Sequence, residues 1–283
     1  MKRQILGPLV VAMAIGCAGE AAAGSIYLTG HDVLLHSGQN SYDNVILNYL
    51  RGAGTASEIA AGSYDILLLR GNVGSVGSIG ITTLEGFGTI TIRNIADFGG
   101  VGGAAALTTA MVGNEVVVIP SHTSCGGCDL TTGDADILES LSAVFTAYFN
   151  AGGDIYANSG ADDTSFYNFL PPSAVASGTS ISGSSGFVAT AAGLAIGIQA
   201  NMINGFATHN RFSSFDTDFT VFETRGVTGG DDEVISLGLR DARIIDDGIV
   251  TDDGTDGDVP EPATMSLLAL GLAAAYAGRR RKA

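Results

Sequence analysis

Residues 115–157 constrain the fold of this chain more than any other part of the sequence. Residues 115–119 form a short apolar run with successive valines, which is typical of a buried strand. Apolar residues at helical spacing predict a helix over residues 134–150, and a Gly-Gly pair ends it before another apolar run at residues 154–157. A strand, a long helix and a second strand in this order predict a β-α-β unit with parallel strands.

The same alternation continues along the rest of the chain. Further apolar runs of strand length lie at residues 25–29, 64–69, 89–92, 219–223 and 234–239. Apolar spacing also predicts helices over residues 42–50 and 186–199. Alternating strands and helices favour an α/β fold, with a mostly parallel sheet covered by helices on both faces. In such a fold, ligands bind at the carboxyl ends of the strands.

The N-terminal residues 1–23 have the three parts of a secretory signal peptide. A basic start precedes an apolar run over residues 5–18, which we expect to be helical, and three alanines at 21–23 supply a cleavage site. We therefore expect signal peptidase to cut after these alanines, so that the mature chain begins at Gly24. Lipidation at Cys17 is an alternative, although the leucine usual three residues before such a cysteine is missing.

The chain ends, over residues 259–283, in a second pattern of three parts. A Val-Pro-Glu-Pro element precedes an uncharged apolar stretch over residues 263–278, and a basic cluster follows. The residues are Val259, Pro260, Glu261 and Pro262, and then Arg279, Arg280, Arg281 and Lys282. A helix over 263–278 rises about 24 Å, so with snorkelling flanks it is predicted to span a membrane. The basic cluster should stay in the cytoplasm, which places the preceding domain outside.

This tail resembles the PEP-CTERM sorting signal of Gram-negative bacteria. The resemblance implies handling by an exosortase, a membrane protease-transpeptidase, at the Pro-Glu-Pro element. It implies an inner-membrane anchor with the domain facing the periplasm before sorting, and then the cell surface or the extracellular space. It also implies an association with exopolysaccharide and biofilm production. A plain tail anchor is the alternative, and it would still place the protein at the membrane.

The charge of the expected exported part excludes one class of partner. Residues 24–258 contain seven arginines and no lysine, against 27 aspartates and glutamates, so their net charge is −20. Such a surface repels nucleic acid and anionic lipid headgroups. We therefore expect no nucleic-acid partner, and an acidic surface that keeps the protein soluble outside the cell.

Within this range we expect one α/β domain over residues 24–245, followed by a linker over residues 246–258. The linker is rich in aspartate and glycine, a composition typical of a solvated segment. The spacing of Asp252, Asp256 and Asp258 leaves a calcium loop as the alternative. The flanking helices and the closing glutamate of an EF-hand are missing, however.

Side chains that can carry chemistry follow two of the predicted strands. His31 and Asp32 come directly after the strand at 25–29, His36 follows shortly after, and His122 and Cys125 come after the Val-rich strand. If these loops meet, His31, Asp32, His122 and Cys125 are the candidate catalytic residues. Imidazoles suit zinc-like ions, so His31, His36 and His122 are the candidate metal ligands. The alternative is that they are ordinary loop residues. The sequence requires no cofactor and identifies none.

Cys125 and Cys128 form a Cys-x-x-Cys pair, for which three roles are open. Paired cysteines of an exported protein usually oxidise, which favours a Cys125–Cys128 disulfide. A redox-active pair is the second possibility, because this spacing can lower a thiol pKa. A metal site that joins both thiolates to His122 is the third, although a lone Cys-x-x-Cys lacks the four ligands that zinc prefers.

The stretch over residues 115–159 resembles class I glutamine-amidotransferase-like and ThuA-like domains, which share a flavodoxin-like sheet. Those families also run through a strand, a loop, a long helix, a Gly-Gly pair and a further strand with a polar loop. The resemblance implies that fold. It carries over no catalytic residue, because Cys125 and Cys128 lack a Gly-x-Cys-x-Gly elbow and no histidine follows the strand at 154–157.

Two hypotheses of function remain open from the sequence. The first is an exosortase-sorted envelope protein that serves as a binding or structural component of the surface or of an exopolysaccharide matrix. Its partners would be signal peptidase and exosortase during export, the membrane, and exopolysaccharide. The second is an extracytoplasmic hydrolase or amidotransferase-like enzyme, metal-assisted or not, with its site at the strand carboxyl ends.

Overall fold

The computed structural model describes residues 23–34, 40–52, 63–71, 84–122, 130–171, 176–226, 230–245 and 248–251. All of them belong to one compact unit, residues 23–253. The signal peptide, the sorting tail, His36, Cys125 and Cys128 lie outside the described residues, and the predictions made for them stay predictions. Among the described residues, no helix is long and apolar enough to cross a membrane.

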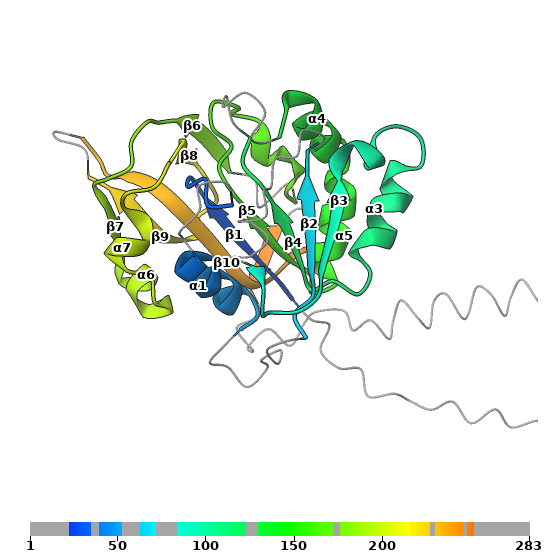
Figure 1. The fold of residues 1–283 in the computed structure, drawn as a ribbon, viewed down its shortest axis with the longest axis horizontal. Helices are drawn as coiled ribbons and strands as arrows, with labels where there is room; N and C mark the ends of the chain where they lie inside the picture. Colours follow the sequence, from blue (N-terminus) through cyan, green and yellow to red (C-terminus); the bar gives the residue numbers. More distant parts are fainter. Residues whose placement is uncertain are drawn as a thin grey trace, which may run out of the picture. The chain divides into compact units, whose positions relative to one another are not determined.

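One half of the sheet is parallel, as the sequence predicted (Figure 1). Its strand order is β3-β2-β4-β5-β1, and every neighbouring pair in that order is parallel. These strands are β1 (Gly24–Thr29), β2 (Ile66–Arg70), β3 (Ile90–Asn94), β4 (Val116–Ile119) and β5 (Asp154–Ala157). β4 and β5 are fully buried, which explains why the sequence reads there as continuous apolar runs.

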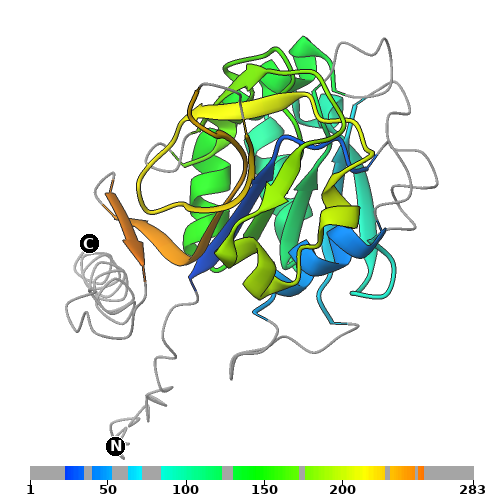
Figure 2. The same ribbon diagram turned by 90° about the vertical axis from the view of Figure 1, so that its left-hand side faces the viewer.

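The other half of the sheet is antiparallel, so the sheet as a whole is mixed rather than mostly parallel. β10 (Glu233–Ile245) pairs with β1, and its other neighbours are also antiparallel to it. The remaining strands are β6 (Ser177–Ser180), β7 (Phe187–Ala189), β8 (Asn210–Ser214), β9 (Thr220–Arg225) and β11 (Gly248–Thr251). Figure 2 shows β1, in blue, beside β10, in orange.

The pairing of β11 with β10 moves one expected boundary. Thr251 lies opposite Ala242, and Gly248 lies opposite Ile245. The sequence placed the end of the domain at residue 245 and a solvated linker after it. Gly248–Thr251 instead continues the sheet, and Ile249 packs against the hydrophobic core, in a segment otherwise rich in aspartate and glycine.

Helices cover both faces of the sheet, as expected. On one face, called here the α1 face, are α1 (Asn40–Leu50), α6 (Ala191–Ile196) and α7 (Ala200–Ile203). On the opposite α5 face are α3 (Gly103–Met111), α4 (Thr132–Ser140) and α5 (Ser142–Asn150). Alternate residues of β1 divide between the two cores: Tyr27 packs on the α1 face, whereas Ile26 and Leu28 pack on the α5 face.

The helix predicted over residues 134–150 is in fact two helices that meet at Leu141. A capping box fixes the start of α4: Asp134 N donates to Thr131 Oγ1 at 3.2 Å, and Thr131 N donates to Asp134 Oδ2 at 2.9 Å. Leu141 leaves the helical conformation, with φ −106° and ψ 11°. The helix predicted over residues 186–199 is likewise shorter, because β7 occupies its first part and only α6 is helical.

Candidate functional site

The carboxyl ends of β1, β4 and β5 meet at one edge of the sheet, called here the carboxyl edge. The register places Ala157 beside both Leu28 and Ile119, so the residues that follow these strands are neighbours. The segment before β8 crosses this edge through a bridge between His31 and Thr208. The crossing is close: a Cβ on Gly30 would lie 1.9 Å from Asn210 O, so only glycine fits there.

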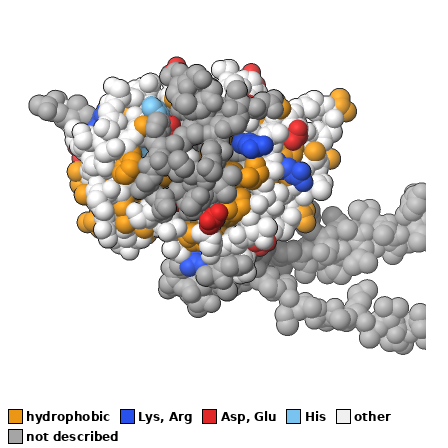
Figure 3. Space-filling model, viewed as in Figure 1, with side chains coloured by type: hydrophobic (Ala, Val, Ile, Leu, Met, Phe, Trp, Pro, Cys, Tyr) orange, Lys and Arg blue, Asp and Glu red, His pale blue; other side chains and the backbone are white. Residues whose placement is uncertain are grey.

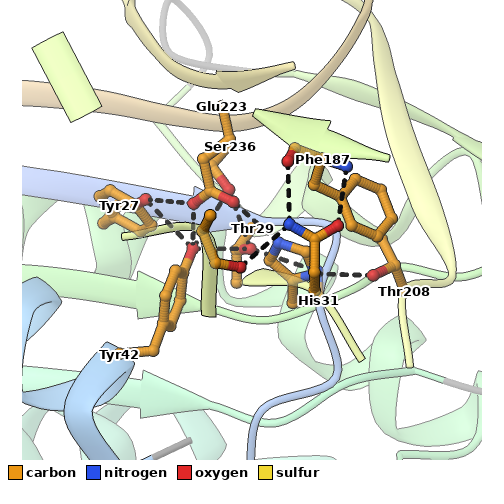
Figure 4. A network of polar contacts seen from close by, with 10 residues as sticks. Tyr27, Thr29, His31, Tyr42, Phe187, Thr208, Glu223 and Ser236 are labelled. Atoms are coloured by element: carbon orange, nitrogen blue, oxygen red, sulfur yellow. Dashed lines mark hydrogen bonds and ion pairs between the residues drawn. The ribbon is translucent and has the colours of Figure 1, made fainter. Parts of the chain in front are cut away.

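His31 is fully buried and both of its ring nitrogens have partners (Figure 4). Nδ1 lies 2.7 Å from Thr208 Oγ1, and Nε2 lies 2.8 Å from Glu223 Oε2. The ring stands edge-on to Tyr42 and Phe187, with interplanar angles of 86° and 88°. Both of these aromatic residues belong to the core of the α1 face. His31 is therefore a core residue held in one orientation.

Glu223 is the centre of this buried network, and sequence reasoning missed it. Its Oε1 accepts a hydrogen bond from Tyr42 at 2.6 Å and another from Tyr27 at 3.2 Å. Burial, followed by the charge of Glu223, raises the pKa of Tyr42 well above its ordinary value, so this hydroxyl keeps its proton and donates. Thr29 and Ser236 complete the network through their hydroxyls. The one signal in the sequence is a lone acid within the apolar run at 219–223.

Asp32 is also fully buried, but it faces a different set of residues. Its Oδ1 accepts a hydrogen bond from Ser121 Oγ at 3.0 Å. Its Oδ2 lies 3.4 Å from Nε2 of His209, whose side chain is 32% exposed. The sequence named Asp32 as a site residue but did not predict that His209 lies beside it, because these two residues lie far apart in the chain. The fold thus joins the ends of β1 and β4 to the segment before β8.

A second serine at the carboxyl edge, Ser159, is hydrogen-bonded to the side-chain amide of Asn210. Ser159 Oγ donates to Asn210 Oδ1 at 2.7 Å, and the backbone amide of Gly160 donates to the same oxygen at 2.8 Å. Tyr167 donates to the carbonyl of Asn158 at 2.9 Å. Ser159, Asn158 and Asn210 are all fully buried. These bonds fasten the loop after β5 to β8.

His122 lies apart from His31. Its ring packs at 5.9 Å from that of Phe166, which belongs to the core of the α5 face. Its backbone amide donates to Ser159 O at 2.8 Å, and a bridge joins it to Leu130. Its side-chain Nδ1 is buried, and no hydrogen-bond partner for it occurs among the described residues. His31 and His122 thus pack on opposite faces of the sheet.

The structure pairs the described members of the predicted catalytic set with residues outside that set. It brings Asp32 to Ser121 and His209, and it brings His31 to Glu223. It does not bring His31 and His122 into one cluster. Within the described part of the chain, no group of three or more His, Cys, Asp or Glu side chains is arranged to hold a metal ion.

The opposite edge of the sheet, called here the amino edge, buries a carboxylate of its own. Asp154 accepts hydrogen bonds from Ser25 N at 2.7 Å and from Tyr64 OH at 2.6 Å. Burial raises the pKa of Asp154 from 3.8 to about 8, although these two hydrogen bonds pull it down. The carboxyl group of Asp154 is therefore mostly protonated at neutral pH.

Comparison with protein families assigns the C-terminal segment of the chain to a known sorting motif. Residues 258–282 match the PEP-CTERM protein-sorting motif. No curated protein and no solved structure matches the chain. The resemblance of residues 115–159 to amidotransferase-like domains accordingly stays a prediction. The matched motif indicates that the chain is an exported protein, sorted by an exosortase through a membrane-anchored route to the cell envelope.

Proposed function

We propose that the α/β domain of this exosortase-sorted protein serves as a binding or structural component of the cell surface or of its exopolysaccharide matrix. One observation carries the proposal. The hydroxyls of Ser121 and Ser159 donate to Asp32 and Asn210, and within the described residues neither donates to a histidine. A serine nucleophile is normally activated by an adjacent base, most often a histidine. The polar groups at the carboxyl edge instead hold loops together.

The burial of His31 supports the same conclusion. A general base must come within hydrogen-bond reach of the substrate proton that it takes. The side chains of His31 and Glu223 are fully buried, and both ring nitrogens of His31 are already engaged. We assign this pair to stabilising the domain rather than to catalysis.

The charge of the domain narrows the class of ligand. A net charge of −20 over residues 24–258 repels anionic polymers at moderate ionic strength. A neutral polysaccharide fits this surface better than one rich in uronic acid or sulfate. Binding should therefore depend weakly on salt concentration.

The test is co-sedimentation of the processed protein with exopolysaccharide from the same cells, compared with His122→Gln and Ser121→Ala variants. We expect binding in all three proteins, with dissociation constants within about twofold of one another. The thermal unfolding curve of each variant serves as the folding control. Failure of the wild-type protein to co-sediment would contradict the proposal, whereas a loss of about tenfold or more in a variant that unfolds normally would place the ligand at that side chain.

One observation favours the enzyme as a second candidate. Asp32 lies beside His209, and a buried carboxylate next to a partly exposed imidazole is how an enzyme orients a general base. The enzyme hypothesis predicts that the wild-type protein cleaves a member of a panel of ester, amide and glycosidic substrates. It further predicts that His209→Gln removes this turnover whereas His122→Gln, a change of the same kind nearby, keeps it.

Processing is tested by the intact mass of the protein from its native envelope, measured without and then with reductant. We expect a chain that starts at Gly24 and ends near Pro260, and a gain of about two mass units on reduction from a Cys125–Cys128 disulfide. A chain that keeps Arg279 to Arg281 would mean that the tail is a plain anchor. An unchanged mass on reduction, in a sample protected from oxidation, would make the redox and metal roles of the thiols the ones to pursue.

A further inference from the structure

Helix α3 presents an exposed and uncharged surface in a strongly acidic domain. This α3 surface consists of Val101, Ala104, Ala105, Thr108, Thr109 and Val112. Residues 99–114 contain no ionisable side chain. Val101 is fully exposed and Val112 is 77% exposed. In Figure 3 the right-hand end of the molecule, where Figure 1 places α3, is mostly white and orange. Exposed apolar patches of this kind mark interaction sites.

The two threonines add to the apolar character of the surface. Thr108 Oγ1 donates to Ala104 O at 2.8 Å, and Thr109 Oγ1 donates to Ala105 O at 2.8 Å. Because each hydroxyl bonds back to a carbonyl of its own helix, the methyl group is what remains for a partner. The exposed side of α3 therefore consists of methyl groups.

A hollow lies beside the C-terminal half of α3, between it and α5. Its volume is about 410 Å³, and its lining includes Met111, Val144, Ala147 and Tyr148, with Val112 at one side. Val101 protrudes at the opposite end of the helix. The nine residues of α3 rise about 14 Å. The α3 surface thus carries a protruding side chain at one end and a hollow at the other.

We propose that the α3 surface binds a second copy of this chain, in a two-fold dimer whose α3 helices lie antiparallel. A two-fold interface requires a surface that complements itself. Antiparallel pairing places Val101 of each copy over the C-terminal end of the other α3, where the hollow lies. The small side chains of Ala104 and Ala105 allow the two helices to approach closely.

Charge favours a second copy as the occupant. Two copies, each with a net charge of −20 over residues 24–258, repel each other wherever their carboxylates meet. Residues 99–114 contain no carboxylate, and Glu115, which lines the hollow, accepts a hydrogen bond from the backbone amide of Asp65, so two copies can touch here with little repulsion between carboxylates. A basic partner would be drawn to the acidic remainder of the domain instead. The uncharged surface is therefore the one at which this chain can meet itself.

The first experiment measures the molar mass of the processed protein by light scattering and sedimentation, for the wild type, Ala105→Glu and Val188→Asp. Val188 is the matched control, because it is an exposed valine, 60% accessible, on β7 rather than on α3. We expect dimers for the wild type and for Val188→Asp. Ala105→Glu places like charges at the contact and should raise the dimer dissociation constant roughly 100-fold. Glutamate favours helix, so circular dichroism should show an intact fold.

The second experiment uses the full chain in cells. Ala105 lies near the middle of α3, so Ala105→Cys should cross-link to its counterpart with a short bismaleimide, above the background given by the native cysteines of the wild type. Val188→Cys should not. A wild-type monomer at about 100 µM, or a dimer that Ala105→Glu leaves intact, would overturn the proposal. Cross-linking of Ala105→Cys only to other molecules would overturn it as well, by assigning the surface to a different partner.

Discussion

The two edges of the parallel sheet both bury a carboxylate, but the two carboxylates have different surroundings. At the carboxyl edge, Glu223 faces the imidazole of His31 at 2.8 Å and accepts further hydrogen bonds from two tyrosines. At the amino edge, the hydrogen bonds to Asp154 come from a backbone amide and from Tyr64, which are neutral donors. Burial then raises the pKa of Asp154 to about 8.

The difference shows how a fold tolerates a buried acid. An acid that contacts several side chains from distant parts of the chain fixes these segments in one orientation. An acid that has only neutral donors keeps the proton itself, so its free-energy cost depends on pH. At the carboxyl edge, the stability of the fold should therefore depend on the partners of the buried acid. At the amino edge, it should depend on pH.

The largest effect should come from breaking the network at Glu223. Glu223→Ala removes the buried carboxylate that the hydroxyls of Tyr27 and Tyr42 and a ring nitrogen of His31 share. We expect the free energy of unfolding, measured with urea, to fall by about 3–5 kcal/mol. Asp218→Ala, which removes an exposed acid just before β9, is the control and should change it by less than about 0.5 kcal/mol. Equal effects of the two changes would show that the network contributes little.

The next effect should come from Asp154, and it should depend on pH. The pKa of Asp154 is about 8 in the folded chain and 3.8 by its ordinary value, so unfolding releases a proton between these two limits. Stability should fall as pH rises from about 4 to 8 and then level off. Asp154→Asn cannot titrate, so it serves as the reference. In a chain that keeps the residues before Gly24, the free energy of unfolding of the wild type should fall relative to that of Asp154→Asn by on the order of 2–5 kcal/mol between pH 5 and 9. Parallel stability curves would mean that Asp154 is ionised in the fold.

The smallest effect should come from His209. The side chain of His209 is 32% exposed, and its Nε2 lies 3.4 Å from Asp32 Oδ2, a distance that is long for a hydrogen bond, so this pair is weak. We expect His209→Gln to lower the free energy of unfolding by about 1 kcal/mol or less. His31→Gln, at the fully buried histidine, should cost several times more. If the two changes cost the same, the contrast between the buried pair and the partly exposed pair fails.

The parallel half of the fold was predictable from the sequence because most of its strands are apolar runs. The antiparallel half was less predictable. β6 and β8 are short and rich in serine, so their residues resemble loops. α3 was missed because, apart from Leu107 and Met111, its residues are alanine, glycine and threonine, which give only a narrow apolar stripe. The break at Leu141 was hidden because both helices continue the same apolar spacing.

The location of the candidate site was predictable from the sequence, but its side-chain contacts were not. By the rule that parallel strands end together, the segments after β1 and β4 were expected at one edge, and there Asp32 accepts a hydrogen bond from Ser121. The partners from the second half of the chain could not be predicted, because Glu223 lies 192 residues from His31. The rule also says nothing about which face a side chain takes beyond the end of a strand. His31 and His122 therefore looked like neighbours and pack apart.

The position of Asp154 makes the domain sensitive to its own maturation. β1 begins at Gly24, where a Cβ would lie 2.5 Å from Gly153 O, and the next amide, Ser25 N, bonds Asp154. A signal-peptidase cut before Gly24 would create an ammonium group one residue from that bond. A positive charge there favours the ionised acid, so the pKa of Asp154 would drop in the mature chain. Removal of the leader would then strengthen the first strand at the pH of the envelope, and precursor and mature protein would differ in stability with an unchanged fold.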